Sequence, residues 1–203
     1  YPLRVLHEYR MEQDDVIATL DWIQNTNLQE IRAQIGTSND RLKLVPLAAE
    51  VLREMVALFD PSEIDISAYG IREGLLYEQM PKKLRAQDPL IEAARATEFS
   101  LARIPGFGEV LFNFILPLFK GSPLERLRLI KAACLLHDTS WRAHPDYRAE
   151  ACFDSATRSS LAGLDHMGRL FLGLALLHRY KNSHNSTKTN SIFNLLSQED
   201  IKS

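Results

Sequence analysis

The chain has 203 residues, a formal net charge of −2 and 45% hydrophobic residues. This length allows one large or two small domains, and the composition is ordinary for a soluble globular protein. The most apolar run, Val110–Phe119, is about half as long as a membrane helix requires, and no signal peptide is visible. We therefore expect a cytoplasmic protein with no membrane partner.

The charge is unevenly distributed along the chain. Residues 1–80 contain 7 Lys/Arg and 14 Asp/Glu, whereas residues 81–203 contain 17 Lys/Arg and 12 Asp/Glu. Such asymmetry suggests two units, the second of which faces something anionic. The alternative is a solvated helical surface that is rich in arginine. No basic run resembles a nucleic-acid motif, so no nucleic-acid partner is expected.

Residues 1–80 predict the main-element order β-α-α-β-α, a piece of an α/β domain. A breaker at Pro81 and a polar connector after it mark the predicted boundary with a second domain, residues 81–203. The predicted strands are Tyr1–Met11 and Ile64–Ser67, and the predicted helices are Gln13–Asn25, a short one from Asn27 to Gly36, Asp40–Phe59 and Ile71–Met80.

Residues 81–203 lack strand signals and predict an all-α domain. Ser122 and Asp165 are predicted N-caps, and Pro89 and Pro123 are predicted at first helical positions. The connector is Lys82–Asp88, and the predicted helices are Asp88–Pro105, Gly108–Phe119, Ser122–His137, Asp146–Thr157 and Asp165–Tyr180.

Two further features concern the chain ends and the cysteines. Lys181–Asn190 is polar and predicts a flexible loop. Ser197 and Asp200 have the spacing of a helix start close to the end of the sequence, and the sequence begins at Tyr1 without methionine. We therefore expect a chain truncated at both ends. Cys134 and Cys152 lie in apolar helical contexts without metal-type spacing, which predicts buried free thiols.

A glycine turn between a predicted strand and a predicted helix is the first candidate site. Gly70 and Gly74 allow close backbone approach, and the start of the helix offers free N–H groups to an anion. Arg72 adds donors that suit phosphate. The turn is therefore a candidate phosphate-binding site, although a tight turn with a surface Arg72–Glu73 pair explains the same residues.

His137 and Asp138, adjacent at the end of a predicted helix, are the second candidate. An imidazole and a carboxylate can share one divalent metal, but a working site needs a further His and Asp. Residues 81–136 contain no histidine, and Arg103 stands about where one would be expected. The alternative is a capped helix end with a hydrogen-bonded histidine. The candidates for additional ligands are His144, Asp146, Asp165, His166 and His178.

The third candidate is the polar and aromatic loop Trp141–Arg148, which precedes a predicted helix. Arg142, His144 and Arg148 are its candidate polyanion-binding residues, because arginine pairs with phosphate oxygens and the surrounding helices are also rich in arginine. The alternative is an interface loop that packs on the first domain.

The order of these motifs resembles the exopolyphosphatase/guanosine pentaphosphate phosphohydrolase (Ppx/GppA) family, most closely its alphaproteobacterial exopolyphosphatases. The resemblance covers nearly the whole chain except Lys181–Asn190. The segments that carry it are Tyr1–Tyr9, Arg41–Pro46, Ser67–Tyr77 and Ala132–Arg148.

The resemblance implies a mainly α chain: the end of a second actin-like (ASKHA) α/β domain over residues 1–80, then an all-α HD-related domain. The catalytic residues and most Mg²⁺ ligands of such a protein are expected upstream of this chain. Gly70, Arg72, Gly74 and, more loosely, Arg41 would form one wall of a cleft. The absent upstream histidine would mean that the HD-like domain keeps its fold and has lost its metal chemistry.

The expected partners are inorganic polyphosphate or guanosine pentaphosphate, and a second copy in a homodimer. The leading hypothesis is an exopolyphosphatase of which this chain is the non-catalytic C-terminal portion. Two alternatives stay open at this point: an HD-type metal-dependent phosphohydrolase that acts on its own, and a non-catalytic module that binds polyphosphate or (p)ppGpp.

Overall fold

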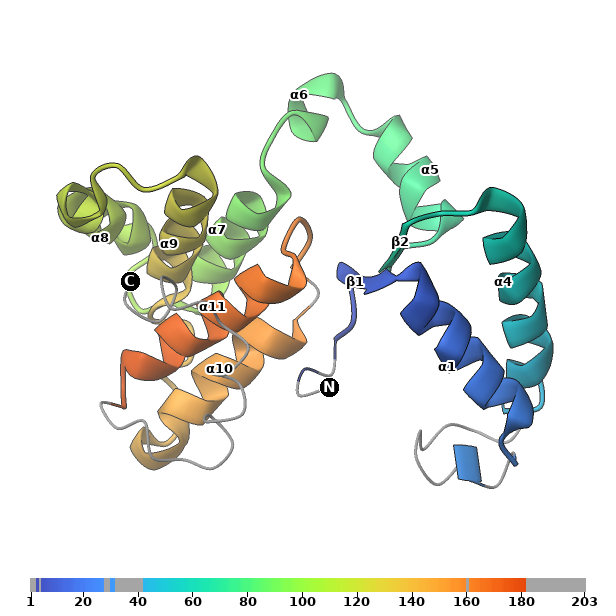
Figure 1. Cartoon of the computed structure of the whole chain (residues 1–203). Coiled ribbons are helices and arrows are strands. Elements are labelled where there is room, and N and C mark those ends of the chain that lie inside the picture. Colours follow the sequence, from blue (N-terminus) through green and yellow to red (C-terminus); the bar gives the residue numbers. More distant parts are fainter. Residues whose placement is uncertain (1–2, 4, 28–29, 32–41, 160, 182–203) are drawn as a thin grey trace. The chain divides into compact units, whose positions relative to one another are not determined.

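A computed structural model describes residues 3, 5–27, 30–31, 42–159 and 161–181 (Figure 1). Two compact units make up the chain. One is Tyr9–Ile66, and the other combines Tyr1–Glu8 with Ser67–Ser203. The predicted domain boundary between residues 80 and 81 does not coincide with this division, and it stays a prediction.

The Tyr9–Ile66 unit is a two-stranded antiparallel ribbon with two helices packed on each other. Tyr9 pairs with Ile66 and Glu12 with Glu63, and across the ribbon Arg10 Nε donates to Asp65 Oδ1 at 2.9 Å. This pairing of opposite charges supports the register. The elements are β1 (Tyr9–Glu12), α1 (Gln13–Asn25), α4 (Val45–Phe59) and β2 (Glu63–Ile66).

Several predicted boundaries in this unit are confirmed, and two are wrong. Helix α1 has its predicted bounds, and β2 lies within one residue of its prediction. The first strand begins at Tyr9 rather than Tyr1, because a four-residue β2 can pair with only four residues. Helix α4 begins at Val45 rather than Asp40, consistent with the preference of Pro46 for the first turn. Most of the predicted helix from Asn27 to Gly36 lies outside the described residues.

The regular secondary structure in the described part of the second unit is all helical, so the prediction of a mainly α chain is confirmed. One predicted helix divides in two: α8 passes into the 3₁₀ helix η1, which contains Pro117 and so lacks one backbone donor. The predicted connector contains a short helix, α6. The elements are α5 (Ile71–Gln79), α6 (Lys82–Arg85), α7 (Pro89–Leu101), α8 (Phe107–Ile115), η1 (Leu116–Phe119), α9 (Leu124–Leu136), η2 (Pro145–Tyr147), α10 (Arg148–Arg158) and α11 (His166–His178).

Two helices of this unit begin at side-chain caps. The Asp88 carboxylate accepts a hydrogen bond from Leu90 N at 2.9 Å, and Asp165 Oδ1 accepts one from Gly168 N at 2.7 Å. Each cap satisfies a backbone donor that the first turn of a helix leaves unpaired. The predicted start at Asp165 is confirmed. Ser122, in contrast, makes no capping bond, and Pro123 occupies the N-cap position of α9.

Helix α11 is the centre of the core and packs against α9 and α10 (Figure 1). The buried core residues come from four helices and the loop before α11: Leu90, Ala94, Ala132, Leu135, Leu136, Cys152, Ala156, Leu161, Leu164, Leu172 and Leu176. Both cysteines are buried free thiols, as predicted, and burial raises the pKa of Cys134 to about 11. No helix in the described ranges is both long and apolar enough to cross a membrane.

A fully buried arginine fastens α11 to the end of α10. Arg169 is 0% exposed, and its guanidinium donates to the backbone oxygen of Ser159 at 2.7 Å. Ser159 directly follows α10, so the cation satisfies a carbonyl at the negative end of the helix dipole. Burial lowers the pKa of Arg169.

The close crossing of α10 and α11 generates a stability prediction. A Cβ atom at Gly173 would lie 2.7 Å from Thr157 Cγ2. Gly173→Ala should therefore lower the free energy of unfolding by about 1–3 kcal/mol, as overpacking of a core does. Circular dichroism during thermal unfolding measures this effect.

The matched control is Gly74→Ala, since Gly74 is also inside a helix but, apart from its chain neighbours and its own helix backbone, no atom lies within 4 Å of the place that a Cβ atom would take. This change should be neutral or slightly stabilising. Equal melting temperatures for the two variants would show that the crossing is not tightly packed.

Candidate functional site

A buried carboxylate organises the face of the molecule where α9 and α11 end. Asp138 is 5% exposed and follows the C-cap of α9. Its carboxylate accepts hydrogen bonds from Arg103 Nε at 2.8 Å and Arg103 Nη2 at 2.6 Å. Arg179 Nη2 lies 3.8 Å from Asp138 Oδ1. The hydrogen bonds from Arg103 hold the pKa of Asp138 below its usual range.

Two aromatic rings each lie close to two arginine side chains, and the first of them is the ring of Trp141. The Trp141 ring centroid lies 5.8 Å from the guanidinium carbon of Arg103 and 4.7 Å from that of Arg142. These distances are typical of cation–π contacts. Trp141 Nε1 in turn donates to the Leu101 carbonyl at 2.9 Å, which holds the indole in place.

The second ring is Tyr180, which follows α11. Its centroid lies 5.0 Å from the guanidinium carbon of Arg179 and 5.6 Å from that of Arg148. We call the four arginines 103, 142, 148 and 179 the arginine row. Among the described residues, Asp138 is the only carboxylate with which the row forms an ion pair. Rings position these cations without neutralising them. The N–H groups that are not already bound to Asp138, as two of Arg103 are, or to the Ala143 carbonyl, as Nη2 of Arg148 is, can bind an anion.

His137 lies beside the row and is itself buried. Its Nδ1 is 2.7 Å from the Cys134 carbonyl oxygen, so Nδ1 carries the proton and Nε2 is the acceptor of the neutral ring. Burial lowers the pKa of His137, which favours this neutral form. A cavity of about 340 Å³ opens here, lined by Arg103, Ile104, Phe107, Leu111, His137, Asp138 and Arg179.

The described residues do not suit a divalent metal at His137 and Asp138. No group of three or more His, Cys, Asp or Glu side chains that could hold a metal occurs in the described part of the chain. Arg103 donates a hydrogen bond to the Asp138 carboxylate, and the Asp165 carboxylate caps α11, so neither is free to bind a metal. The metal role of His137 and Asp138 remains a sequence prediction for which the geometry offers no third ligand.

The predicted polyanion-binding residues lie in the same part of the unit. Arg142 and Arg148 belong to the arginine row. His144 does not: its side chain is exposed, and its Nδ1 accepts a hydrogen bond from Asp146 N at 3.3 Å. Its observed contact is therefore a local cap of η2.

The predicted phosphate turn contains an anion of its own. Glu73 Oε2 accepts a hydrogen bond from Gly70 N at 2.7 Å, so the prediction that the N–H groups at this helix start are all free is wrong for Gly70. The same bond lowers the pKa of Glu73. Arg72 is exposed, and Gly74 has open space around it. The role of these residues in phosphate binding stays a prediction, and Arg41 lies outside the described residues.

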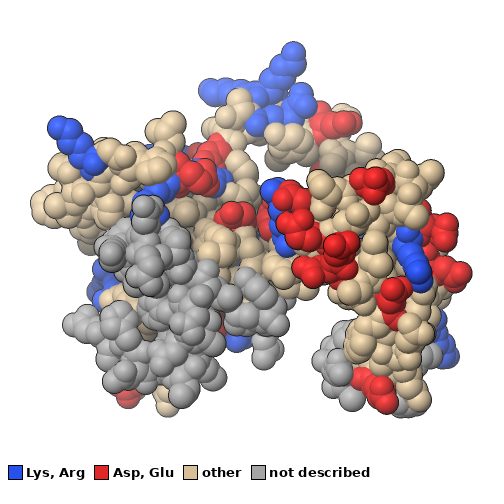
Figure 2. Space-filling view, viewed as in Figure 1, with Lys and Arg blue, Asp and Glu red and all other residues tan. Residues whose placement is uncertain are grey.

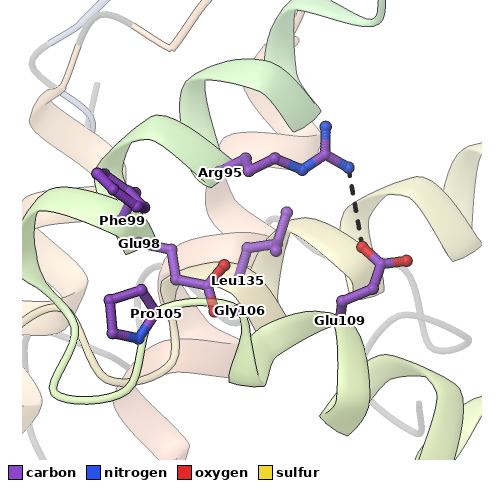
Figure 3. A pocket seen from close by; sticks show the side chains of 7 residues that line it. All are labelled: Arg95, Glu98, Phe99, Pro105, Gly106, Glu109 and Leu135. Carbon is purple, nitrogen blue, oxygen red and sulfur yellow. Dashed lines mark ion pairs between the residues drawn. The ribbon is translucent and has the colours of Figure 1, made fainter.

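A larger cavity, of about 460 Å³, lies between α7 and α8 and has the wrong charge for an anion (Figure 3). Arg95 is paired there with Glu109 at 3.8 Å and also with Glu92. Glu98, 2% exposed, accepts a hydrogen bond from Gly108 N at 2.6 Å near the start of α8. These carboxylates neutralise the cation and support the helix, so we assign this cavity a structural role.

Figure 2 shows scattered acidic side chains with fewer basic ones on the visible face of the Tyr9–Ile66 unit, and basic side chains over α6. The sequence did not single out Arg103 and Arg179 as binding residues. The available signal was weak: both were members of an arginine-rich set, and neither stands in a motif.

The pairing of Asp138 generates a prediction about pH. Because the folded-state pKa lies below the ordinary value of 3.8, the ionised carboxylate stabilises the fold above that pH. This stabilisation is lost as the pH falls through the folded-state pKa. Asp138→Asn should cost about 1–3 kcal/mol at pH 7, and the gap between variant and wild type should narrow below about pH 4.

Urea unfolding at several pH values measures that gap. The control is Asp154→Asn, which removes an exposed ion pair with Arg158 and should cost at most about 0.5 kcal/mol. A gap for Asp138→Asn that does not depend on pH would contradict the assignment.

Comparison with known proteins bears on the same region. Residues 120–202 match the family model for the exopolyphosphatase C-terminal domain. The chain is also 32% identical over 127 residues to retrograde regulation protein 2 of Saccharomyces cerevisiae, which corresponds to 58% of this chain and 20% of the yeast protein. The chain thus spans about a fifth of the length of this curated relative. The predicted resemblance is confirmed over residues 120–202, which carry most of the arginine row and match the exopolyphosphatase C-terminal domain.

Proposed function

We propose that the protein containing this chain is an exopolyphosphatase that releases terminal phosphate from inorganic polyphosphate, with guanosine pentaphosphate as an alternative substrate. In this proposal the chain binds and orients the polyanion. The attacking water, the carboxylate that positions it and Mg²⁺ belong to residues outside this chain.

The observation that carries the proposal is the arginine row. Four guanidiniums lie near two rings, and only those of Arg103 and Arg179 share the Asp138 carboxylate, so the surface keeps an excess of positive charge. Arg148 donates Nη2 to the Ala143 carbonyl at 3.2 Å, and the other donors of the row that no carbonyl or carboxylate accepts remain for an anion. Arginine binds phosphate oxygens with two parallel hydrogen bonds, which suits a chain of repeated phosphates. The family match over residues 120–202 supports a phosphate-related role for this face.

The residues of this chain would act by electrostatics. A row of cations attracts a polyanion, raises its local concentration and keeps it in register, and salt screens this attraction. Holding several phosphates at once lowers the dissociation rate of long chains more than that of short ones. No step of the reaction is assigned to a metal on His137 or Asp138, because these residues offer no suitable ligand set.

The remaining parts of the chain have proposed roles that rest on the family resemblance. Residues 1–80 would be the end of an actin-like domain, with Gly70, Arg72 and Gly74 on one wall of its cleft.

A homodimer is also proposed, and a set of exposed apolar side chains supports it. Val110 and Phe114, four residues apart on α8, and Leu118 on η1 are 61%, 80% and 80% exposed.

The two competing functions predict different results. An HD-type phosphohydrolase would need metal bound at His137 and Asp138, and a pure binding module would show no turnover. Phosphate release from polyphosphate is therefore compared for this chain and the full-length protein, with and without Mg²⁺ or Mn²⁺. Activity in the full-length protein alone is expected. Metal-dependent release by this chain that His137→Ala abolishes would favour the phosphohydrolase.

Substitutions in the row test its role. Arg142→Gln and Arg148→Gln in the full-length protein should each raise KM for long polyphosphate several-fold, leave kcat nearly unchanged, and weaken the salt dependence of kcat/KM. The effect on tripolyphosphate should be smaller, since a short chain cannot reach the whole row.

Arg158→Gln is the matched control, because Arg158 is an exposed arginine already paired with Asp154 at 3.1 Å. Equal KM changes for the control and the row variants would show that the row acts only as general surface charge.

The predicted phosphate turn has its own test. Arg72→Ala in the full-length protein should reduce kcat/KM by about tenfold, equivalent to about 1.4 kcal/mol of lost stabilisation. Steady-state phosphate release measures this change in kcat/KM. The control is Arg53→Ala on α4, which should leave kcat/KM unchanged. Unchanged kinetics for Arg72→Ala would remove this residue from the site.

A further inference from the structure

A third cavity, which we call the apolar groove, has mainly apolar walls. Leu111, Ile115 and Phe119 line it from α8 and η1, and Phe171 and Ala175 line it from α11. Helix α9, which contacts both α8 and α11, also lines it. Its volume of about 240 Å³ is a little below the usual range for drug-sized ligands, about 300–1,000 Å³. The groove therefore suits a small apolar group.

The groove is elongated along α8 and η1. Leu111 and Ile115 are about one turn apart on α8, and Phe119 follows on η1. At a rise of about 1.5–2 Å per residue, the three positions span about 12–14 Å. An extended alkyl chain matches such a line of apolar side chains, and covering them removes apolar surface from water. Leu111 also lines the cavity of about 340 Å³, so the two cavities meet at this end.

The shared end of the groove carries a positive charge. His137 and Arg179 line both cavities, and burial lowers the pKa of His137, which favours its neutral imidazole. Arg179 Nη2 lies 3.8 Å from Asp138 Oδ1, which is too long for a hydrogen bond, so its donors can serve a ligand. The two cations of Arg103 and Arg179 and the one carboxylate of Asp138 leave a single positive charge. This end therefore matches a ligand with one negative charge.

We propose that the apolar groove binds an aliphatic monocarboxylate, with the carboxylate on Arg179 and the alkyl chain between α8 and α11. One guanidinium can bind one carboxylate through two parallel hydrogen bonds. A phosphate chain presents only oxygen atoms, so it would gain nothing from the apolar walls. The ligand is not a phosphate compound and the site requires no hydrolytic activity, so the proposal does not depend on the proposed function.

Calorimetric titration of the full-length protein tests the proposal with three probes below their micelle-forming concentrations: hexanoate, octanoate and octan-1-ol. Octanoate should bind about tenfold more tightly than hexanoate, because each fully buried methylene group strengthens binding about fourfold and the outer ones are only partly covered. Octan-1-ol should bind about tenfold more weakly than octanoate, because it lacks the charge. Absence of octanoate binding, or an affinity that does not depend on chain length, would overturn the proposal.

Ala175→Leu tests where the alkyl chain lies. Ala175 is exposed, so folding should be preserved, but a larger side chain there would fill part of the groove. Octanoate should then bind about tenfold more weakly. The matched control is Ala96→Leu, an exposed helical alanine of α7 that does not line the groove, and it should leave octanoate binding unchanged. Equal octanoate affinities for the two variants would show that octanoate binds elsewhere and contradict the proposal.

Arg179→Gln tests the charged end. It should weaken octanoate binding about tenfold and leave octan-1-ol binding unchanged, whereas the control Arg158→Gln should change neither. Equal losses for both probes would show that Arg179 does not bind the carboxylate.

Two further measurements on the same samples separate this proposal from others. A protein that binds octanoate but releases no phosphate from polyphosphate would contradict only the proposed function. A protein that releases phosphate but does not bind octanoate would contradict only the groove. If octanoate did not bind and Ala175→Leu changed the oligomeric state in analytical ultracentrifugation, the groove would be a contact between copies, which would also overturn the proposal.

Discussion

The hydrogen-bonded pair of Asp138 and Arg103 is the interaction on which the arrangement of the arginine row depends. The Asp138 carboxylate is almost fully buried, and a buried charge without partners would cost several kcal/mol. Arg103 supplies three of its hydrogen bonds, one from the backbone and two from the guanidinium. Because Arg103 comes from the loop after α7 and Arg179 from the end of α11, one carboxylate at the end of α9 aligns three segments. The positions of Trp141 and the cavity follow from this alignment.

An arginine and a divalent metal can both neutralise a buried carboxylate, but they support different chemistry. A metal offers open coordination positions and lowers the pKa of bound water. A guanidinium offers only fixed N–H donors, which bind oxyanions and generate no nucleophile. With Arg103 on Asp138, the described geometry at the His137–Asp138 pair is that of an arginine-bound carboxylate.

Local signals in the sequence were sufficient for much of the fold. Helix α1 and the Asp165 cap were predicted correctly because periodicity and capping depend on residues within a few positions. The site was harder to predict: Arg103 and Asp138 are 35 positions apart, and only tertiary packing brings them together. At the glycine turn, a nearby residue rather than a distant one explains why the prediction was wrong. The motif suggested a vacant helix start, but Glu73, three residues from Gly70, supplies the anion.

Pairing, rather than composition, determines where the basic charge of the helical unit can act. Arg128 is bound by Asp88 and Glu125, and Arg95 by Glu92 and Glu109, so these arginines contribute little to the surrounding potential. The four arginines of the row all have rings as neighbours, and only Arg103 and Arg179 also lie near a carboxylate, that of Asp138. A ring attracts a guanidinium through its quadrupole and carries no net charge, so the positive field outside the ring persists. The paired arginines on α7 and α9 thus add little to the positive field, whereas the row retains more of it. An excess of basic residues in a sequence identifies such a surface only when the partner of each cation is known.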